Sequence, residues 1–542
     1  MLKNYFKMAL RNLRKQRGYS LLNIAGLSVG LACFMLVVLF IQYEFRYEKH
    51  HDNASRIYRI IVTQNLGDRV FNSTYSPVPL SETLARELPE VEAFTRFYFS
   101  RGVLSYGENR FTEDGISFVD PGVLKIFSFP LIKGHPETAL KNKFSAVITR
   151  ETAEKYFGRD DPIGKTMTLD SRAKLDVTVT GVMENHPSTT EIAPDVLIPL
   201  KTLEDVMPNS ESFFQNWLSQ QIRSYILLPQ KHSVPEMRTK IMGIFKHHIL
   251  PEDRRELELE QLAKAHLYSI DDSPGYIRTL YIFLACGLLV LITACINFMN
   301  LATARSANRA REVGMRKVVG AARRQLMVQF MGESLIYAFV SAFIAVGLTI
   351  AAIPVLNRLT GQLIGPADLG QSSIVLALLS VTVLTGFVAG SYPAFLLSGL
   401  QPSSVLRGRL TRGTGGSILR RILVVTQFTI SIVLIITTII IGRQLAFIHN
   451  RDLGFQKEHI VVIQTQAGEA TRNLEPLKTA LNQNPRIKGV TGSMQLPSST
   501  GMYNNVTWEG AADDEQIEII HNTVDYDFLD TFGIELAAGR NF

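Results

Sequence analysis

Long apolar stretches dominate the pattern of the 542-residue chain. Five of them contain no Lys, Arg, Asp or Glu, and they cover residues 21–41, 280–299, 334–354, 374–397 and 422–441. Each reaches the roughly 20 residues that a helix needs to cross a bilayer. A charge at the bilayer centre costs roughly 2.5–3.5 kcal/mol, so uncharged stretches of this length favour membrane spans over buried helices of a soluble protein. We predict an integral membrane α-helical protein with five transmembrane helices.

The first apolar stretch has to be compared with a cleaved signal peptide. It is 21 residues long, and the sequence QYEFRYEKHH follows it directly, without a small-residue cleavage site. A signal peptide has a shorter apolar core and such a site. We therefore interpret residues 21–41 as a retained anchor, preceded by a basic N-terminus at 1–20.

Basic residues mark one side of the membrane. Three segments, 1–20, 300–333 and 398–421, fall on the same side if all five spans are real. Their basic residues are Lys3, Lys7, Arg11, Arg14, Lys15, Arg17, Arg305, Arg309, Arg311, Arg316, Lys317, Arg323, Arg324, Arg407, Arg409, Arg412, Arg420 and Arg421. The positive-inside rule makes that side cytoplasmic, including the N-terminus. The net charge of +7 thus indicates topology and contact with anionic lipid, not nucleic-acid binding.

The long segment 42–276 lies outside the cytoplasm in this topology and has the pattern of a mixed α/β domain. Apolar residues alternate in 56–62 and 175–182, as expected for half-buried strands. Residues 79–90 start with a proline and place Leu80, Leu84 and Leu88 on one helical face. At about 235 residues the segment can bury a core of its own.

The second outside segment, 442–542, repeats part of the first. FVDPGVLKIFSFPLIKG (118–134) aligns with TVDYDFLDTFGIELAAG (523–539) at a constant offset of 405 residues, as in Val119 and Val524. Arg46 and Arg451 keep the same offset just after the first and fifth spans. We interpret 442–542 as the start of a second, incomplete copy. We expect the natural protein to continue with the rest of that domain and about three further spans, since one copy of the pattern contains four.

The sequence gives little support for a catalytic or metal-binding motif. The stretch GRDDPIGKT (158–166) ends like a phosphate-binding loop, but five residues separate Gly158 from Gly164 where the motif needs four. A helix ending at Gly158, followed by a turn into a strand, is the favoured interpretation. Cys33, Cys286 and Cys295 all lie in spans and indicate apolar packing, not disulfides or metal ligation. The pairs His50–His51 and His247–His248 lack helical ligand spacing, and we expect them on a solvated surface.

Three stretches together resemble one known family. REVGMRKVVGAARRQLMVQFMGESL (311–335), which follows CINFMNLATARSANRA, resembles the signature of FtsX-like permeases, the membrane subunits of MacB-type ABC systems. SAVITRETAEKYFGRDDPIGKTM (145–167) resembles their periplasmic core domain, and SYPAFLLSGLQPSSVLRG (391–408) resembles the end of the permease repeat. The resemblance covers essentially the whole chain. It is greatest to permeases with two such modules.

The resemblance implies a MacB-like periplasmic core domain at 42–276, an FtsX-like permease domain at 280–400 and a second core domain that begins at 442. It implies a multi-pass permease subunit of the bacterial inner membrane, without an enzymatic site or a cofactor of its own. A separate cytoplasmic ATPase would drive dimeric permeases, which transmit motion to the periplasm for export or release of a substrate, with a periplasmic adaptor or substrate protein as further partner. The alternative is a membrane signalling or scaffold protein whose periplasmic domain regulates a partner such as a cell-wall hydrolase.

Residues 300–333 form the cytoplasmic segment that the resemblance assigns to ATPase coupling. Charges alternate with the apolar Val313, Val318 and Val319, which we expect to form one apolar side. Glu312 and Arg316 have the i, i+4 spacing of a helical ion pair. Gly314 and Gly320 cost helix stability, so we expect a turn or a close backbone approach at one of them. The predicted coupling residues are Arg311, Glu312, Val313, Gly314, Met315, Arg316, Lys317 and Gly320. An amphipathic helix on anionic lipid is the alternative.

Small and polar residues in the spans predict helix packing. Gly26 and Gly30 form a small-xxx-small pattern that favours a close helix contact. Asn23, Asn297, Asn300 and Gln427 favour hydrogen bonds between helices over a transport site. The predicted spans contain no acidic residue, which argues against a proton-coupled or sodium-coupled carrier.

Overall fold

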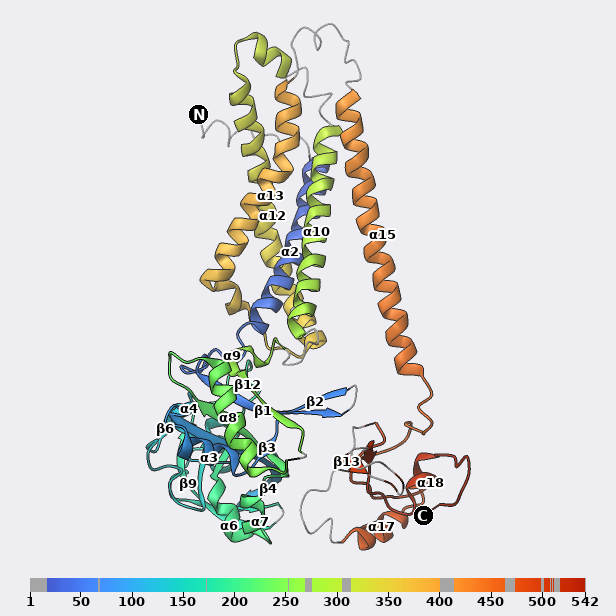
Figure 1. Cartoon of the computed structure of the whole chain (residues 1–542). Coiled ribbons are helices and arrows are strands. Elements are labelled where there is room, and N and C mark those ends of the chain that lie inside the picture. Colours follow the sequence, from blue (N-terminus) through green and yellow to red (C-terminus); the bar gives the residue numbers. More distant parts are fainter. Residues whose placement is uncertain are drawn as a thin grey trace. The chain divides into compact units, whose positions relative to one another are not determined.

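The computed structural model describes residues 17–66, 69–171, 173–251, 253–268, 275–304, 313–399, 414–463, 473–498, 502–506, 508, 510 and 517–541. The chain divides into two compact units (Figure 1). The first contains Met1–Arg46 and Pro274–Asn450, and the second contains Tyr47–Ser273 and Arg451–Phe542. Each unit is described by itself.

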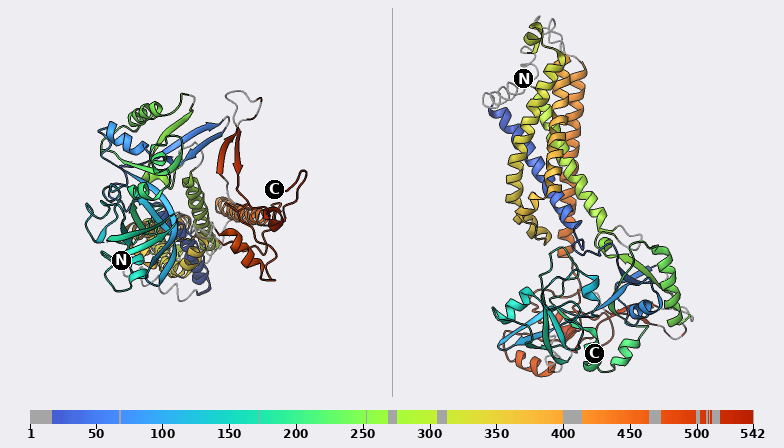
Figure 2. Two further views of the ribbon diagram at one scale, coloured as in Figure 1. Left: turned by 90° about the horizontal axis from the view of Figure 1, so that it is seen from below. Right: turned by 90° about the vertical axis from the view of Figure 1, so that its left-hand side faces the viewer.

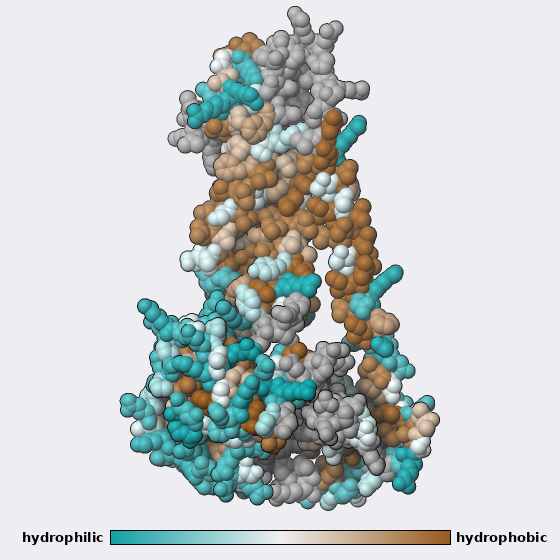
Figure 3. All heavy atoms as spheres, in the orientation of Figure 1, coloured by the Kyte–Doolittle hydropathy of each residue, from teal (hydrophilic) through white to brown (hydrophobic). Residues whose placement is uncertain are grey.

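Five long helices make up the first unit, and all five are long and apolar enough to cross a membrane. They are α2 (Arg17–Glu44), α10 (Tyr276–Ala304), α12 (Arg323–Thr360), α13 (Ser372–Gly399) and α15 (Thr414–Asn450), with a short 3-10 helix, η2 (Pro366–Gly370), between α12 and α13. Apolar side chains surround them (Figure 3). The predicted five-span membrane fold is confirmed.

Each helix is longer than the apolar stretch that predicted it. The third stretch ended at Pro354, whereas α12 continues through that proline to Thr360. A proline inside a membrane helix is tolerated because neighbouring helices can compensate for the missing hydrogen bond. Pro393 lies inside α13 in the same way. Charge-free sequence therefore marks the part of a helix that fits the bilayer, not the whole helix.

The core of this unit lies among α2, α10 and α12 (Figure 2). Leu27 and Leu31 of α2 pack with Leu291 of α10 and Ala338 of α12. At Gly30 the backbones come so close that an added Cβ would lie 2.7 Å from the Cβ of Ala294. A Cβ on Gly26 would lie 3.4 Å from Asn297 Nδ2. Both glycines of the small-xxx-small pattern therefore face α10.

Polar side chains join the C-terminal end of α2 to its neighbours. Arg46 forms an ion pair of 2.8 Å with Asp368. Gln42 donates to Gln371 and Ser373, each at 2.8 Å. The buried Glu44 accepts hydrogen bonds from Gln362 and from Tyr276 at the start of α10. These contacts fix the end of α2 against the loop between α12 and α13.

The second unit contains a large mixed sheet from residues 57–261. Its strands are β1 (Ile57–Leu66), β2 (Arg69–Ser73), β3 (Ser76–Pro77), β4 (Ala93–Tyr106), β5 (Asn109–Val119), β6 (Leu131–Lys133), β7 (Ser145–Thr149), β8 (Thr166–Asp170), β9 (Lys174–Met183), β10 (Val196–Pro199), β11 (Gln220–Leu227) and β12 (Arg255–Gln261). The order is β12-β1-β11-β4-β5-β10-β7-β9-β6, with β2, β3 and β8 paired beside it. Most pairs are antiparallel, while β7 runs parallel to β9 and β10 parallel to β5.

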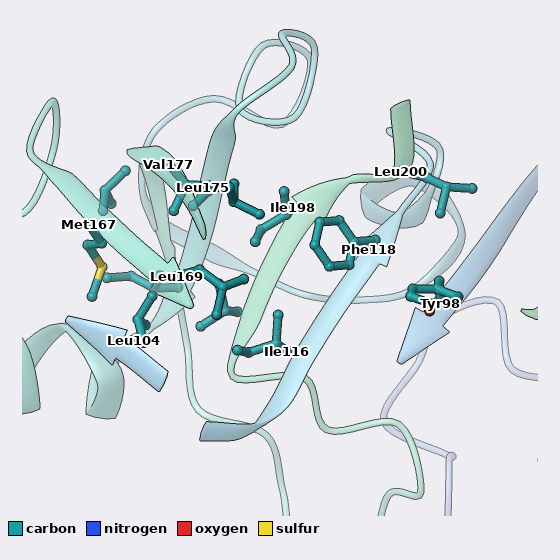
Figure 4. Close-up of a cluster of buried hydrophobic side chains, with 14 of the residues drawn as sticks. Tyr98, Leu104, Ile116, Phe118, Met167, Leu169, Leu175, Val177, Ile198 and Leu200 are labelled. Carbon is teal, nitrogen blue, oxygen red and sulfur yellow. The ribbon is translucent and has the colours of Figure 1, made fainter. Parts of the chain in front are cut away.

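Short helices cover the sheet. They are α3 (Leu80–Glu87), α4 (Val123–Ile126), α5 (Arg150–Phe157), α6 (Leu203–Val206), α7 (Ser210–Gln215), α8 (Val234–His248) and α9 (Leu262–Ala265), with η1 (Leu200–Thr202) before α6. Ile222 and Ile226 of β11 face the clusters under α5–α7 and under α3 and α8, respectively, while Tyr225 faces the cluster near α4 and α9. Alternation along a strand places the first two clusters on the same face. Figure 4 shows the first cluster, with Phe118 and Ile198 from neighbouring strands.

The local predictions for this domain are confirmed. Strands cover 56–62 and 175–182 as β1 and β9, and the helix at 79–90 is α3, with Leu80, Leu84 and Leu88 all buried. The stretch that resembles a phosphate loop follows α5, which ends at Gly158 with φ +61°, and β8 begins at Thr166. Lys165 pairs with Asp160 at 3.1 Å. GRDDPIGKT is therefore a helix-to-strand turn.

Residues 451–541 contain α17 (Leu474–Asn482), β13 (Met502–Val506), β14 (Ile517–His521) and α18 (Phe528–Phe532). Ser493 bridges Val524, and the Met494 N–H donates to Thr523. In the first domain, Phe97 is opposite Val119 and Tyr98 is opposite Phe118. At the offset of 405, Val119 and Phe118 correspond to Val524 and Thr523. These corresponding positions pair with a preceding strand segment in both regions. Gly134 and Gly539, also 405 apart, have φ values of +90° and +92°.

Candidate functional site

The coupling segment begins, within the described residues, with a short helix at 313–318 that precedes α12. Val313 is buried and packs with Leu326 and Phe330 of α12 and with Ala394 of α13. Two predicted coupling residues, Arg311 and Glu312, lie outside the described residues, and so does the predicted ion pair between Glu312 and Arg316. The short helix is therefore anchored on two membrane helices through its first turn.

The C-terminus of the short helix has the geometry of a Schellman motif. The Gly320 N–H donates to Lys317 O at 3.1 Å, and the Ala321 N–H donates to Arg316 O at 3.0 Å. Gly320 has φ +99°, a conformation that favours glycine. The Ala322 N–H then donates to the Gln325 side chain at the start of α12. Of the two glycines expected to turn or approach closely, Gly320 makes the turn, while Gly314 is buried inside the helix.

The basic side chains of the segment contact the protein itself. Arg316 donates to Gln329 Oε1 at 2.7 Å, and the Lys317 ammonium donates to Ser398 O at 2.6 Å. Ser398 belongs to the last turn of α13, so Lys317 connects the short helix to that span. These two charges stabilise the position of the segment, and their donors point towards α12 and α13.

The short helix at 313–318 and the turn after it expose apolar side chains. Met315 and Val318 are each 62% exposed, and Val319 is 88% exposed, whereas Val313 is 3% exposed. The expectation that the three valines share one apolar side is therefore wrong. Val313 and Val318 are five residues apart, which rotates them about 140° around a helix of 3.6 residues per turn. The segment has one apolar face for anchoring and a second that faces solvent.

One group of described residues in the second unit brings metal-ligating atoms together. Atoms of Glu48, His50 and His51 lie within 4.8 Å of one another. The backbone N–H of Ser128 donates to His51 Nδ1 at 3.1 Å, so the neutral ring carries its proton on Nε2, 3.3 Å from Glu48. That tautomer offers a metal no lone pair on His51. The group fits a proton-bearing contact better than a metal site.

The expectation of solvated histidines needs a correction at this group. His51 is 2% exposed, and neither ring nitrogen of His50 reaches solvent. Burial, with His51 alongside, lowers the pKa of His50 to about 4. Adjacent histidines gave no periodic signal, because the chain turns here, packs the His51 ring against Phe127 and Phe129, and places the His50 ring against that of His51. His247 and His248 are exposed, as expected.

Two protein-family models match separate parts of the chain. Residues 20–242 match the MacB-like periplasmic core domain, and residues 284–402 match the FtsX-like permease C-terminal domain. A macrolide export ATP-binding/permease protein MacB from Bdellovibrio bacteriovorus is 24% identical over 266 residues, which is 48% of this chain and 38% of that protein. The MacB protein of Syntrophobacter fumaroxidans is 23% identical over 374 residues, 60% of this chain and 52% of that protein.

Solved structures match only part of the chain. A domain of a permease protein from Porphyromonas gingivalis gives a TM-score of 0.34 at 21% identity, covering 39% of this chain and 92% of that one. The periplasmic region of MacB from Actinobacillus actinomycetemcomitans gives 0.30 at 14% identity, covering 39% and 90%. The chain spans less than two thirds of the MacB proteins named above. The two family models together show that the chain belongs to the FtsX-like ABC transporter permeases that carry a MacB-like periplasmic core domain.

Proposed function

We propose that this protein is the membrane subunit of an ABC transporter and that Met315, Val318 and Val319 dock a cytoplasmic ATPase. The observation that carries the proposal is this exposed apolar surface, held on a helix that is anchored to α12 and α13. Apolar residues rimmed by polar ones at the surface are typical of protein–protein contacts. ATP hydrolysis takes place on the partner, and this chain contributes no catalytic group.

The segment is better suited to a protein partner than to a lipid surface. A helix lying on anionic lipid needs free Arg and Lys side chains to reach phosphates. Here Arg316 and Lys317 donate to Gln329 and Ser398, and Met315, Val318 and Val319 are the side chains that the short helix and its turn expose. The residues that reach out can fill a groove on another protein. The charged side chains of Arg316 and Lys317 keep the short helix in place.

In this proposal the protein lies in a bacterial inner membrane with its basic segments in the cytoplasm and both outside regions in the periplasm. Two permease modules act as a dimer, and the ATPase moves the short helix and hence α12 and α13. The outside domain passes the motion to a periplasmic adaptor or substrate, for export or release. Gly26 and Gly30 support this role by allowing α2 to pack closely on α10.

The alternative function is a membrane signalling or scaffold protein whose outside domain regulates a partner such as a cell-wall hydrolase. It would use the same outside domain without needing ATP. The exposed surface at Met315, Val318 and Val319 favours the transporter, since a scaffold that acts only outside needs no anchored docking helix on the other side.

Affinity purification of the full chain from its native membrane tests the proposal. We expect an ABC ATPase to co-purify with the wild type. V319D places a charge in the apolar contact and should reduce the recovered ATPase by about tenfold or more, since a charge buried without a partner costs well over 1.4 kcal/mol.

V461D is the matched control, because Val461 is 84% exposed and lies in the second outside region. It should leave the recovered ATPase unchanged. The transporter function is wrong if no ATPase co-purifies with the wild type. The docking surface is wrong if V319D recovers as much ATPase as V461D does.

A further inference from the structure

Glu48 occupies a strained position just after the first membrane helix. It has φ +59°, although it is not glycine, and its residue is only 1% exposed. Its backbone N–H donates to Thr189 O at 3.0 Å. A left-handed backbone on an ordinary residue persists only where the surroundings over-determine it, and such positions cluster at functional sites. It lies four positions after Glu44, the last residue of α2.

The Glu48 carboxylate is held by the loop that carries Thr189. Its Oε1 accepts the backbone N–H of Glu191 at 2.6 Å, and its Oε2 accepts the Thr190 hydroxyl at 2.8 Å. His51 Nε2 approaches Oε2 at 3.3 Å. Hydrogen bonds to an ionised oxygen are roughly twice as strong as neutral ones. The chain leaving α2 is thus fixed to residues 189–191 through both backbone and side chain.

The chain that leads back to the membrane meets the same loop. His266, ten residues before α10 begins at Tyr276, lies 3.5 Å from the Glu191 carboxylate. The Tyr47 ring stacks on the His266 ring, with centroids 3.6 Å apart and planes 5° apart. Glu191 also lies 3.6 Å from Arg59 of β1. Both chain connections to the membrane helices therefore converge on residues 189–191.

This loop leads directly into the middle of the sheet. It joins β9 to β10. β10 pairs with β5 and β7, and β9 pairs with β6, β7 and β8, so a displacement of the loop reaches six strands of the sheet. The loop covers residues 184–195, and its last residue is bound to the sheet, because the Asp195 N–H donates to Gly115 O at 2.7 Å.

We propose that Glu48 is a positioning residue that passes movement of α2 to the outside domain through residues 189–191. This inference rests on the proposed function and specifies where the motion enters the domain. Tyr47, His266 and Glu191 form the second arm of the same junction, which holds the chain before α10.

Hydrogen exchange of the full chain in nanodiscs, with the ATPase that co-purifies with it, tests the inference. In the wild type, ATP binding should change exchange in β9, β10 and residues 184–195. E48Q replaces one accepting oxygen by an NH2 group that faces the Glu191 N–H or the Thr190 hydroxyl. We expect the ATPase bound to E48Q to hydrolyse ATP, while the ATP-dependent change in the outside domain is lost. Exchange at Glu191 should rise about tenfold with the lost hydrogen bond.

E184Q is the matched control. Glu184 lies at the start of the same loop, but its exposed carboxylate pairs with Arg150 at 2.7 Å. The control should keep the ATP-dependent change. A purely structural role for Glu48 would raise exchange without removing the response to ATP, so a retained response in E48Q overturns the inference.

A folding defect and a failed function give different results. If β7 loses protection in E48Q, T190V replaces it as the test, because this variant leaves the carboxylate in place and removes one donor to it, together with the acceptor of the Ile192 N–H. A weakened response with β7 protected then supports the inference, and a response equal to that of E184Q overturns it. A wild type that hydrolyses ATP without any change outside overturns the proposed transmission itself.

Discussion

The two outside regions share a strand pairing and differ in the ion pair that it carries. In the first domain, Arg96 of β4 is opposite Asp120, one step beyond the pair Phe97 and Val119. In the second region, Gly492 is opposite Asp525, one step beyond the bridge of Ser493 and Val524. The carboxylate is present in both. The cation is Arg96 on the strand in one region and Lys478 on α17 in the other.

The change of element alters how the charge is held. Arg96 donates to both oxygens of Asp120, at 2.7 and 2.8 Å, and to Val78 O. Burial alone would lower the pKa of Arg96, but Asp120 outweighs it and raises that pKa. Lys478 meets Asp525 and Asp527 as a point charge, and both raise its pKa. The repeated carboxylate therefore has a cationic partner in both regions, although the cation comes from a strand in one and from a helix in the other.

Removing each carboxylate should separate the two pairs most clearly. D120N removes the bidentate partner of the buried Arg96 and leaves it only the exposed Glu82 at 3.2 Å, so it should lower the free energy of unfolding by about 3–5 kcal/mol. D525N leaves Lys478 with Asp527 at 2.8 Å, so the loss should be about 1 kcal/mol or less. The chain has two tryptophans, Trp217 in the first domain and Trp508 in the second region. Urea unfolding of W508F and W217F backgrounds reports each region separately, and equal shifts would contradict the comparison.

Shortening one leucine side chain on the helix before each strand pair tests how tightly that helix packs on its region. Leu84 of α3 is fully buried, and L84A should cost about 2–5 kcal/mol because it leaves a cavity. Leu477 of α17 is half-buried, and L477A should cost about 1–2 kcal/mol. The same single-tryptophan backgrounds measure both. A larger loss for L477A would mean that the second region has a core as well packed as the first.

In the second region, α17 packs closely on the backbone at Gly492. A Cβ there would lie 2.7 Å from Leu474 Cδ2 of α17. G492A should therefore destabilise the second region by about 1 kcal/mol, with Leu474 turning aside to limit the cost. G489A is the control, because its Cβ would lie 3.4 Å from Thr531 Oγ1. Thermal unfolding followed by Trp508 should leave the control near the wild type, and a stable G492A would show that the space is open.

Acid should weaken the second region through Asp525. Hydrogen bonding by Lys478 lowers the pKa of Asp525 below its ordinary 3.8. A lowered carboxyl pKa adds stability that is complete above the ordinary value and is lost as pH falls through the lowered one. Urea midpoints from Trp508 should fall below pH 3.8 by more in the wild type than in D525N. Parallel curves would mean that the pair adds nothing to stability.

The sequence predicted the elements whose signal is local. Uncharged length identified the five spans, and the spacing of Leu80, Leu84 and Leu88 identified α3. It also placed one of two glycines at the turn, since Gly320 needs a positive φ that few other residues adopt. Periodicity is visible within a few turns of chain, so these features needed no tertiary information.

Features that depend on distant contacts were not predictable. Val313 and Val319 look equivalent in sequence, and only the packing against Phe330 and Ala394 separates a buried anchor from an exposed face. The contacts of Glu48 were not predictable from the sequence, because its partners Thr190 and Glu191 are more than a hundred residues away along the chain. The order of the sheet strands, with β11 between β1 and β4, likewise carries no local signal.

The length of α12 sets how far its first residues stand from the bilayer. The helix begins at Arg323, whereas its charge-free part begins at Ser334. At 1.5 Å per residue, those eleven residues extend the helix by about 16 Å. The headgroup layer on each side is about 5–8 Å thick. If the charge-free part of α12 fills the bilayer, Val319, next to the turn that starts α12, therefore lies on the aqueous side of the headgroups, where the proposed ATPase can reach it.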